Sequence, residues 1–407
     1  MNMLDIYRKG PRPKTSPTLL TILLSLAICS QIIEKIVGFN IYPMASSLVI
    51  LSLLLVFKGL YIRLNISLLI VFFTISSHFI IAYVFNPCDF NFKYTFSLFL
   101  LLVVFIVYDR EDVFYAFSDP LLHYLIVGLT VFFLILSLLG YSIIDLLAYK
   151  TRSKIGLYSE YSHLAIFSLP SVLYLFFVGK RLYSIVSFTI IMGFGFSSTA
   201  FVFCFIAANL LMYVRFGFFL LSFSLPLVTL IVVFMAFALG MQDTIARVTG
   251  IIEAGSNIQD SALSSIVWLN GWSMLYDYLV NTNGLGVGIN RMGCGAFSEY
   301  GSYTKDIVRF LGMPLNVSDG SFVSSKIISE FGILGFIIVA FFLLKVRNFL
   351  SKITFTELIY DNTVSFGFVC CTSILVLLFI RGMGYFNFPF IMCICWMFFS
   401  RKVKRVT

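Results

Sequence analysis

The sequence predicts an all-α, polytopic integral membrane protein with about 12 transmembrane helices. Of its 407 residues, 60% are hydrophobic and 12% are charged, whereas about a quarter of the residues in soluble domains are charged. Continuous apolar runs approach or exceed about 18 residues, which is the length of a membrane-spanning helix. The strands of a β-barrel would instead show apolar and polar residues alternating over segments of about ten residues. We therefore expect a single transmembrane domain over residues 1–407.

Polar breakers divide the first half of the chain into six apolar runs of spanning length. The predicted spans are 19–37, 42–57, 66–85, 94–108, 121–139 and 163–178. Lys58 and Arg63 lie in the turn after the second span, and a mixed DRED turn follows the fourth. The polar segment 140–162 separates the fifth span from the sixth.

The apolar stretch 182–214 is too long for one crossing, because a helix rises by about 1.5 Å per residue. The segment GFGFSSTA offers a natural break within it, so it is divided into a seventh and an eighth span. A ninth span is predicted at 216–239, and spans ten to twelve at 327–344, 364–380 and 388–399. A large polar loop, 240–323, precedes the tenth span.

The positive residues predict the orientation in the membrane, because cytoplasmic loops carry an excess of Lys and Arg. Placing both termini in the cytoplasm puts the following residues inside: Lys58, Arg63, Lys180, Arg181, Arg215, Lys345, Arg347 and Lys352. The loops 140–162 and 240–323 then both lie on the extracytoplasmic face. The net charge of +9 is scattered through these short turns, so no nucleic-acid partner is expected. No cleavage site follows the basic N-terminus, which is predicted to be a cytoplasmic tail.

Six of the eight cysteines lie within apolar runs, where a thiol behaves as a small hydrophobic group. Only Cys88 and Cys294 fall in loops, and we do not expect a disulfide between them. Cys393 and Cys395 lack a nearby histidine or carboxylate and are interpreted as packing residues. The loops show no cluster of acids and histidines typical of a metal site, and no cofactor is expected.

The loop 140–162 concentrates positive charge on the face where the orientation rule disfavours it. Lys150, Arg152 and Lys154 lie within five residues of one another. They form either a solvated turn that contacts lipid headgroups or an anion site for a phosphate or diphosphate, whose oxygens match the arginine fork. Glu160 and His163 follow where the sixth span begins, three residues apart and so on one helix face. They either cap the helix and pack locally or supply an acid or base.

The loop 240–323 contains a predicted helix at 261–280, in which Trp268 and Trp272 lie four residues apart. This helix either lies in the membrane interface or packs in the core. The glycine-rich segment NGLGVGINRMG follows and carries Arg291. Alternating glycines allow backbone N–H groups to approach an anion closely.

Further charges lie at the end of this loop and beyond it. Arg309 and Asp319 precede the tenth span, Glu330 falls in its first turns, and Arg381 lies between the last two spans. A carboxylate at the depth of Glu330 is costly unless it is paired. Lys326, four residues earlier, is the local partner, so Glu330 serves either a structural ion pair or a site.

Two segments resemble the O-antigen and capsule repeat-unit polymerases, the Wzy family. GLYSEYSHLA, which follows Arg152, resembles a short motif of these polymerases, although Tyr161 stands where the family often has proline. NGLGVGINRMG and SDGSFVSSKIISEFGILGF resemble the outer loop and following helix that these polymerases share with the O-antigen ligases. Asp319 stands at roughly the position of the ligases' histidine, which favours a polymerase. Arg309 and Gly320 match one loop motif of some polymerases, but Arg152 has no corresponding glycine.

The resemblance implies a transferase at the outer face of a bacterial inner membrane, acting on undecaprenyl-diphosphate-linked oligosaccharides. A growing glycan would leave its lipid diphosphate and join a new lipid-linked unit, as O-antigen or capsule. Arg152, Arg291 and Arg309 would hold diphosphates, with Lys154 and Arg381 as further cations. Glu160, His163 or Asp319 would deprotonate the acceptor hydroxyl, without a metal. The implied partners are membrane lipid, a chain-length regulator and a flippase.

Three alternatives remain open from the sequence. An O-antigen ligase would transfer the glycan to lipid A-core and shares the second loop. A lipid-linked oligosaccharide flippase would carry charges within its spans and show repeated halves, and no internal repeat is evident. A membrane scaffold would need no site at all.

Overall fold

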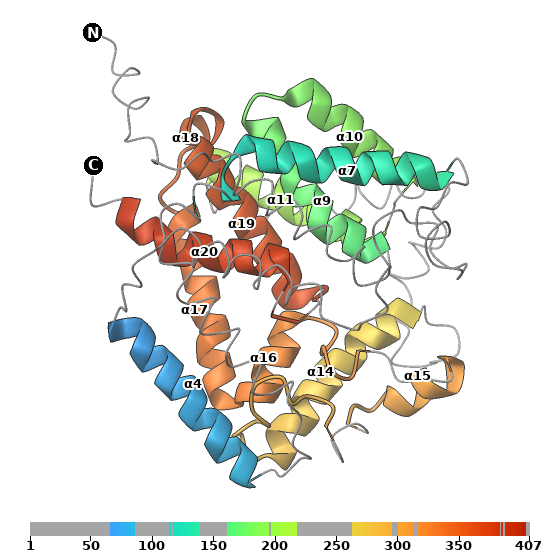
Figure 1. Cartoon of the computed structure of the whole chain (residues 1–407), viewed down its shortest axis with the longest axis vertical. Helices are drawn as coiled ribbons and strands as arrows, with labels where there is room; N and C mark the ends of the chain where they lie inside the picture. The colour runs from blue at the N-terminus through green and yellow to red at the C-terminus, as the bar shows by residue number, and fades with distance from the viewer. Residues whose placement is uncertain are drawn as a thin grey trace, which may run out of the picture.

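The computed structural model describes residues 66–85, 114, 117–138, 161–194, 197–217, 263–294, 300–311, 316–382, 384–385 and 387–403. Every regular element within these residues is a helix (Figure 1). The first five are α4 (Ile66–Phe85), α7 (Pro120–Leu138), α9 (Tyr161–Phe177), α10 (Arg181–Phe194) and α11 (Ser198–Phe216). Three more helices follow from residue 263 onward: α14 (Leu263–Asn281), α15 (Thr304–Leu311) and α16 (Val323–Phe331). The last four are α17 (Ile333–Leu350), α18 (Phe355–Tyr360), α19 (Asn362–Phe379) and α20 (Phe388–Val403).

Local capping residues fix several helix ends. The Ser197 hydroxyl accepts a hydrogen bond from the Ala200 N–H and so begins α11, because a helix N-terminus leaves its first N–H groups without intrahelical partners. Thr354 and Glu357 form a reciprocal capping box at the start of α18. The Asp361 carboxylate accepts from the N–H groups of Thr363 and Val364 and begins α19.

Most predicted spans that fall on described residues coincide with helices. The span 66–85 is α4, the span 121–139 is α7, and the span 163–178 is α9. The predicted break in 182–214 separates α10 from α11, and the last two spans correspond to α19 and α20. The spans predicted at 19–37, 42–57 and 94–108 lie outside the described residues, and so does the span 216–239 except for its first two residues. Most of the loop 140–162 and residues 240–262 also lie outside them.

The predicted tenth span, 327–344, is not one helix. The chain forms α16, turns at Gly332 and continues as α17. Gly332 has a φ of 58°, and a Cβ there would lie 1.9 Å from the Gly284 carbonyl oxygen. The helix pair is folded back tightly, since a Cβ on Gly335 would lie 2.7 Å from the Ile327 carbonyl oxygen. Only glycine tolerates both contacts.

Three described helices are long and apolar enough to cross a membrane: Ser198–Phe216, Ile333–Leu350 and Asn362–Phe379. Shorter apolar helices accompany them, so the described fold is consistent with a membrane-embedded protein. α19 is mostly buried and packs against α9, α11, α16, α17, α18 and α20. By contrast, α17 exposes large apolar side chains such as Ile333 and Ile337, as a lipid-facing helix does.

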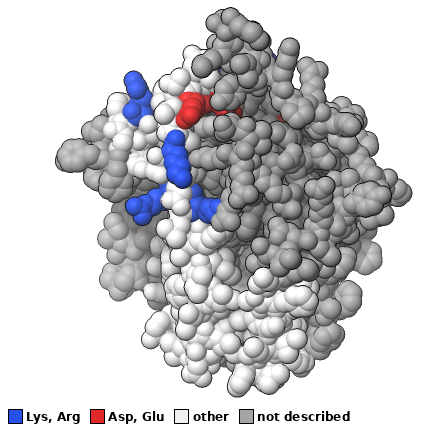
Figure 2. Space-filling view, turned by 90° about the vertical axis from the view of Figure 1, so that its left-hand side faces the viewer, with Lys and Arg blue, Asp and Glu red and all other residues white. Residues whose placement is uncertain are grey.

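One end of the helix assembly is rich in charge. α18 contacts α9 and α11, and the Arg215 guanidinium at the end of α11 lies 5.3 Å from the centre of the Phe355 ring. On the face drawn in Figure 2, the charged side chains gather in the upper half, and the lower part of the described surface is uncharged. This distribution matches a charged rim beside an apolar, lipid-facing band.

Candidate functional site

The candidate site is built on α16, whose nine residues are all buried. Lys326 and Glu330 lie four residues apart and therefore on one helix face. Their ammonium and carboxylate groups are 3.0 Å apart, with side chains 2% and 0% exposed. The ion pair predicted from the sequence is confirmed, and it lies in the interior of the protein.

The Glu330 carboxylate also binds a segment from elsewhere in the chain. It accepts hydrogen bonds from the backbone N–H of Asn290 at 2.6 Å, from that of Met292 at 3.5 Å, and from the Tyr385 hydroxyl at 2.6 Å. A buried carboxylate needs several such donors. Because Asn290 and Met292 flank Arg291, Glu330 fixes the backbone that carries this arginine.

The glycine-rich segment packs on the C-terminal end of α16. The N–H groups of Val287 and Gly288 donate to the carbonyl oxygens of Ser329 and Glu330 at 3.2 and 2.8 Å. Gly286 has a φ of 80°, and a Cβ there would lie 2.5 Å from the Glu330 carbonyl oxygen. At Gly286, therefore, the absence of a side chain allows close approach to a helix end.

Arg291 is fully buried, with 0% of its side chain exposed. Its guanidinium carbon lies 4.9 Å from the centre of the Tyr83 ring on α4, a cation–π distance. His78, on the same helix, places Nε2 2.8 Å from the Leu285 carbonyl oxygen and its ring 5.2 Å from that of Phe331. α4 therefore covers the segment that carries Arg291.

Asp319 lies half-buried in the turn before α16. A Cβ built on Gly384 would be 3.6 Å from an Asp319 carboxylate oxygen and 3.9 Å from Lys326 Cε, so both side chains border the segment 384–385. The Lys326 ammonium also donates to the Ser318 carbonyl oxygen and lies 5.3 Å from the centre of the Tyr385 ring. Asp319 thus borders the same group of side chains.

Arg381 is placed near the start of α16 by its neighbour. The Gly382 N–H donates to the Ser321 carbonyl oxygen at 2.8 Å, and a Cβ on Gly382 would lie 2.7 Å from the Val323 nitrogen. The structure therefore assembles three predicted site residues, Arg291, Asp319 and Arg381, around α16. We call this group, with Lys326, Glu330 and Tyr385, the α16 cluster.

Burial raises the pKa of Tyr385 well above its ordinary value, and the negative charge of Glu330 raises it further. Tyr385 therefore stays protonated at neutral pH and donates its hydrogen bond to Glu330. This orients the carboxylate toward the loop that carries Arg291.

The other predicted site residues lie elsewhere. Arg309 is exposed in the last turn of α15, and His163 is half-buried in the first turn of α9, which packs against α7, α10, α11 and α19. Arg152, Lys154 and Glu160 fall outside the described residues.

Sequence reasoning missed Tyr385, Tyr83 and His78. The available signal for the last two was their polar groups within the predicted span 66–85, since such residues in a spanning helix are functional candidates.

α14 supports the α16 cluster from the opposite side. The hydroxyls of Ser321 and Ser325 donate to the α14 carbonyl oxygens of Val267 and Gly271 at 2.7 and 2.6 Å. The rings of Trp268 and Trp272 both lie against Phe322. Of the two interpretations of this helix, the structure shows packing on its Trp-bearing side.

Cys294, three residues after Arg291, is disulfide-bonded to a cysteine outside the described residues. The other five cysteines that the structure describes are free thiols. Within the described ranges, no group of three or more His, Cys, Asp or Glu residues is placed to hold a metal ion. Metal independence of the reaction stays a prediction.

No family model matches the sequence, and neither the curated proteins nor the solved structures contain a match. The likeness to the polymerase family consequently rests on the two loop segments of the sequence.

Proposed function

We propose that the protein polymerises undecaprenyl-diphosphate-linked oligosaccharide repeat units into O-antigen or capsular polysaccharide. The observation that carries this proposal is the buried network in which Glu330 holds the backbone on both sides of Arg291. A buried ion pair and its hydrogen bonds are costly to assemble. Their use to hold a loop that carries an arginine is typical of a preorganised site.

The location of the α16 cluster supports a reaction at the outer membrane face. Glu330 lies near the start of α17, and the 18 residues of that helix span about 27 Å to the charged end. That end carries Arg347 and Lys352, which the positive-inside rule assigns to the cytoplasm. The disulfide at Cys294 fits an oxidising compartment. About 12 spans, with both termini cytoplasmic in a bacterial inner membrane, complete the proposed topology.

The proposed step is a displacement at the anomeric carbon of the donor sugar. The acceptor hydroxyl oxygen forms the new glycosidic bond, the bond from that carbon to the lipid diphosphate breaks, and the diphosphate leaves with the bonding electrons. Arg291 stabilises the charge that develops on the leaving oxygens, with Arg381 as a further cation. Asp319 takes the proton from the acceptor hydroxyl. Glu330, Lys326 and Tyr385 act as positioning residues.

The buried state of Arg291 places a requirement on this proposal. Because its side chain is 0% exposed, a donor diphosphate reaches it only after the Tyr83 side of α4 opens. A guanidinium stacked on a ring keeps its N–H groups directed outward in its own plane. Arg152, Lys154, Glu160, His163 and Arg309 remain proposed contacts for the second lipid-linked substrate.

Reconstitution with a defined substrate tests the proposed function. The purified protein is supplied with one lipid-linked repeat unit, and the products are separated on a gel with and without a chelator. We expect a ladder spaced by one repeat unit and unchanged by the chelator. The absence of a ladder with an authentic donor would contradict the polymerase assignment, and its loss with chelator would contradict metal independence.

A further inference from the structure

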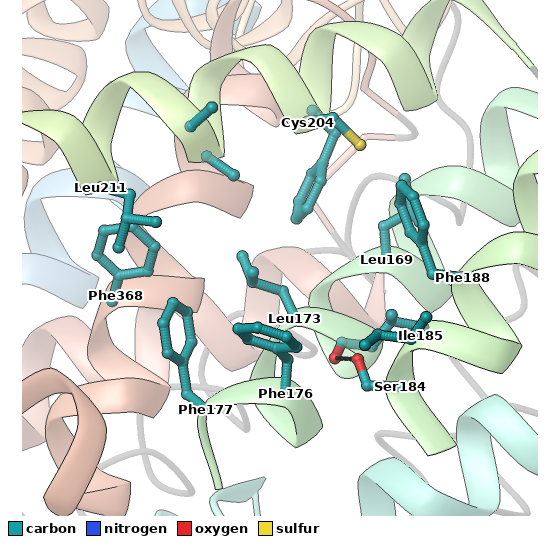
Figure 3. A pocket seen from close by; sticks show the side chains of 14 residues that line it. Leu169, Leu173, Phe176, Phe177, Ser184, Ile185, Phe188, Cys204, Leu211 and Phe368 are labelled. Carbon is teal, nitrogen blue, oxygen red and sulfur yellow. Dashed lines mark hydrogen bonds between the residues drawn. The ribbon is translucent and has the colours of Figure 1, made fainter. Parts of the chain in front are cut away.

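A second feature lies away from the α16 cluster: an apolar cavity of about 310 Å³ between α9, α10 and α11, closed on one side by Phe368 of α19 (Figure 3). Its walls are aliphatic and aromatic side chains, together with Cys204. The one hydroxyl in the wall, that of Ser184, donates to the Val172 carbonyl oxygen at 2.7 Å and is satisfied. A ligand for this cavity must therefore be apolar.

The apolar helix faces beside the cavity indicate where such a ligand comes from. Ile185 and Phe176, which line the cavity, are 52% and 38% exposed, and Leu182 on the same helix as Ile185 is 79% exposed. Exposed apolar side chains on helices of a membrane protein face lipid. The cavity is therefore accessible from the hydrocarbon region of the bilayer.

Three exposed cations lie at helix ends next to residues that line this cavity. Arg181 precedes the lining residues Ser184 and Ile185 by three and four residues, and Arg215 follows the lining residue Leu211 by four. Residues at these spacings share a helix face. Lys180 follows the end of α9 after Phe177, and Figure 3 shows Phe177 and Leu211 at the same end of the cavity.

Long basic side chains at helix ends extend toward the membrane surface and the headgroups there. The guanidinium carbon of Arg215 lies 5.3 Å from the centre of the Phe355 ring. This contact holds the guanidinium at the end of α11. An apolar cavity flanked by three cations at helix ends matches a molecule that joins a hydrocarbon chain to a negative group.

We propose that this cavity binds one acyl chain of an anionic bilayer phospholipid, with the headgroup phosphate held by Lys180, Arg181 and Arg215. The cavity volume of about 310 Å³ is far above the roughly 10–15 Å³ that one water molecule needs, so a segment of a hydrocarbon chain fits within it. Lys180, Arg181 and Arg215 belong to the set of cations that the positive-inside rule assigns to the cytoplasmic face. The proposed lipid site is therefore distinct from the proposed substrate site on the outer face.

Filling the cavity tests the chain site. Ala208 lines the cavity, whereas Ala340 is exposed on α17, so Ala208→Trp and Ala340→Trp form a matched pair. The purified proteins are freed of loosely bound lipid and weighed by native mass spectrometry with added phosphatidylglycerol. We expect one tightly retained phospholipid on the wild type and on Ala340→Trp, and at least a tenfold weaker affinity for Ala208→Trp. Equal retention by all three would overturn the proposal.

The headgroup site is tested with a second pair of variants. Lys180→Gln/Arg181→Gln removes two of the three cations, whereas Arg347→Gln/Lys352→Gln removes two cations elsewhere at the charged end. Only the first pair is expected to weaken phosphatidylglycerol at least fivefold relative to phosphatidylcholine. Equal binding of the two lipids by the wild type, or tighter binding of a polyprenyl phosphate in competition, would overturn the assignment.

A label on the wild type covers the case in which Ala208→Trp does not fold. Phosphatidylglycerol with a diazirine in its acyl chain is irradiated with the protein, and the modified peptides are sequenced. Labelling within 169–177 and 203–211 is the expected result. Labelling spread evenly over the lipid-facing helices, α17 included, would contradict a specific chain site.

Discussion

At the scale of single residues, the Lys326–Glu330 pair places two opposite charges in the interior of the protein. Both side chains are almost completely buried, and each charge alone in the interior would be strongly unfavourable. The pair is stable because Glu330 accepts hydrogen bonds from Tyr385 and from the backbone of Asn290 and Met292. Removing the Glu330 carboxylate would leave the Lys326 ammonium, the Tyr385 hydroxyl and the two backbone N–H groups without the acceptor they share.

Glu330→Gln is the most conservative test of this network. The variant keeps an acceptor oxygen for the Asn290 N–H but leaves the Lys326 ammonium buried without its counter-ion. We expect a loss of about 3–5 kcal/mol in the free energy of unfolding, measured by thermal or denaturant unfolding in detergent. Lys326→Met/Glu330→Gln should recover much of this loss, because it removes the isolated charge. If the double variant is no more stable than the single one, the ion pair is not what holds the site together.

Tyr385 predicts a specific dependence of stability on alkaline pH. Its pKa is about 10 when unfolded and is raised well above that in the folded protein by burial. Folding therefore favours the protonated form, so this contribution is complete below pH ~10 and is lost as the pH rises toward the folded pKa. Tyr385→Phe should be less stable than the wild type at pH 8, and the difference should narrow above pH ~10. A difference in the free energy of unfolding that stays constant from pH 8 to pH 11 would contradict a buried, protonated Tyr385.

At the scale of the elements, the junction of α16 and α17 determines where the site lies. Gly284 contributes the carbonyl oxygen that accepts the Ile333 N–H at 2.8 Å, and the loop that carries Arg291 continues from Gly284. The break at Gly332 therefore brings the end of α16 and this loop together. A continuous helix would place Glu330 far from Asn290.

Gly332→Ala tests the junction against a matched glycine. Gly332 and Gly179 both have positive φ, at 58° and 88°, but an added Cβ meets backbone only at Gly332. Gly179→Ala should cost about 1 kcal/mol of unfolding free energy through backbone strain alone. Gly332→Ala should cost several kcal/mol more and reduce the yield of folded protein, as followed by fluorescence-detected size exclusion. Equal behaviour of the two variants would show that the close contact at Gly332 is absent.

The sequence predicted those elements and pairs that depend on local patterns. The run 66–85 and the break between α10 and α11 are visible because apolar runs and polar or glycine breakers are local, and Lys326 and Glu330 are one helical turn apart. The break at Gly332 was missed, since hydropathy is continuous over 327–344 and the turn depends on the distant Gly284. Tyr385 was missed for the same reason, because its contact with Glu330 joins α16 to the distant segment between α19 and α20.

At the scale of the whole molecule, the two ends of the helix assembly differ in character. One end carries Lys180, Arg181, Arg215 and Lys352, and the α16 cluster lies at the other end of α17. The positive-inside rule assigns the first end to the cytoplasm. The proposed enzyme thus works on the outer face, and the proposed lipid site lies on the inner side.

Cysteine labelling in intact cells tests this orientation. Lys305 on α15 and Lys352 after α17 are both exposed, so Lys305→Cys and Lys352→Cys form a matched pair. A membrane-impermeant maleimide should label Lys305→Cys in intact spheroplasts and Lys352→Cys only after the membrane is opened. The wild type provides the background from native thiols. The reverse pattern would place the α16 cluster in the cytoplasm and exclude an outer-face polymerase.

The central claim is that Arg291 stabilises the leaving diphosphate in a polymerisation reaction. The most direct test compares Arg291→Ala, Arg291→Lys and the control Arg347→Ala, which removes an exposed arginine at the opposite end of α17. The rate of ladder formation from one lipid-linked repeat unit is measured with equal amounts of folded protein. We predict a loss of about 10²–10³-fold for Arg291→Ala, a smaller loss for Arg291→Lys, and wild-type rates for Arg347→Ala. Ladders of normal length and rate from folded Arg291→Ala would contradict the account.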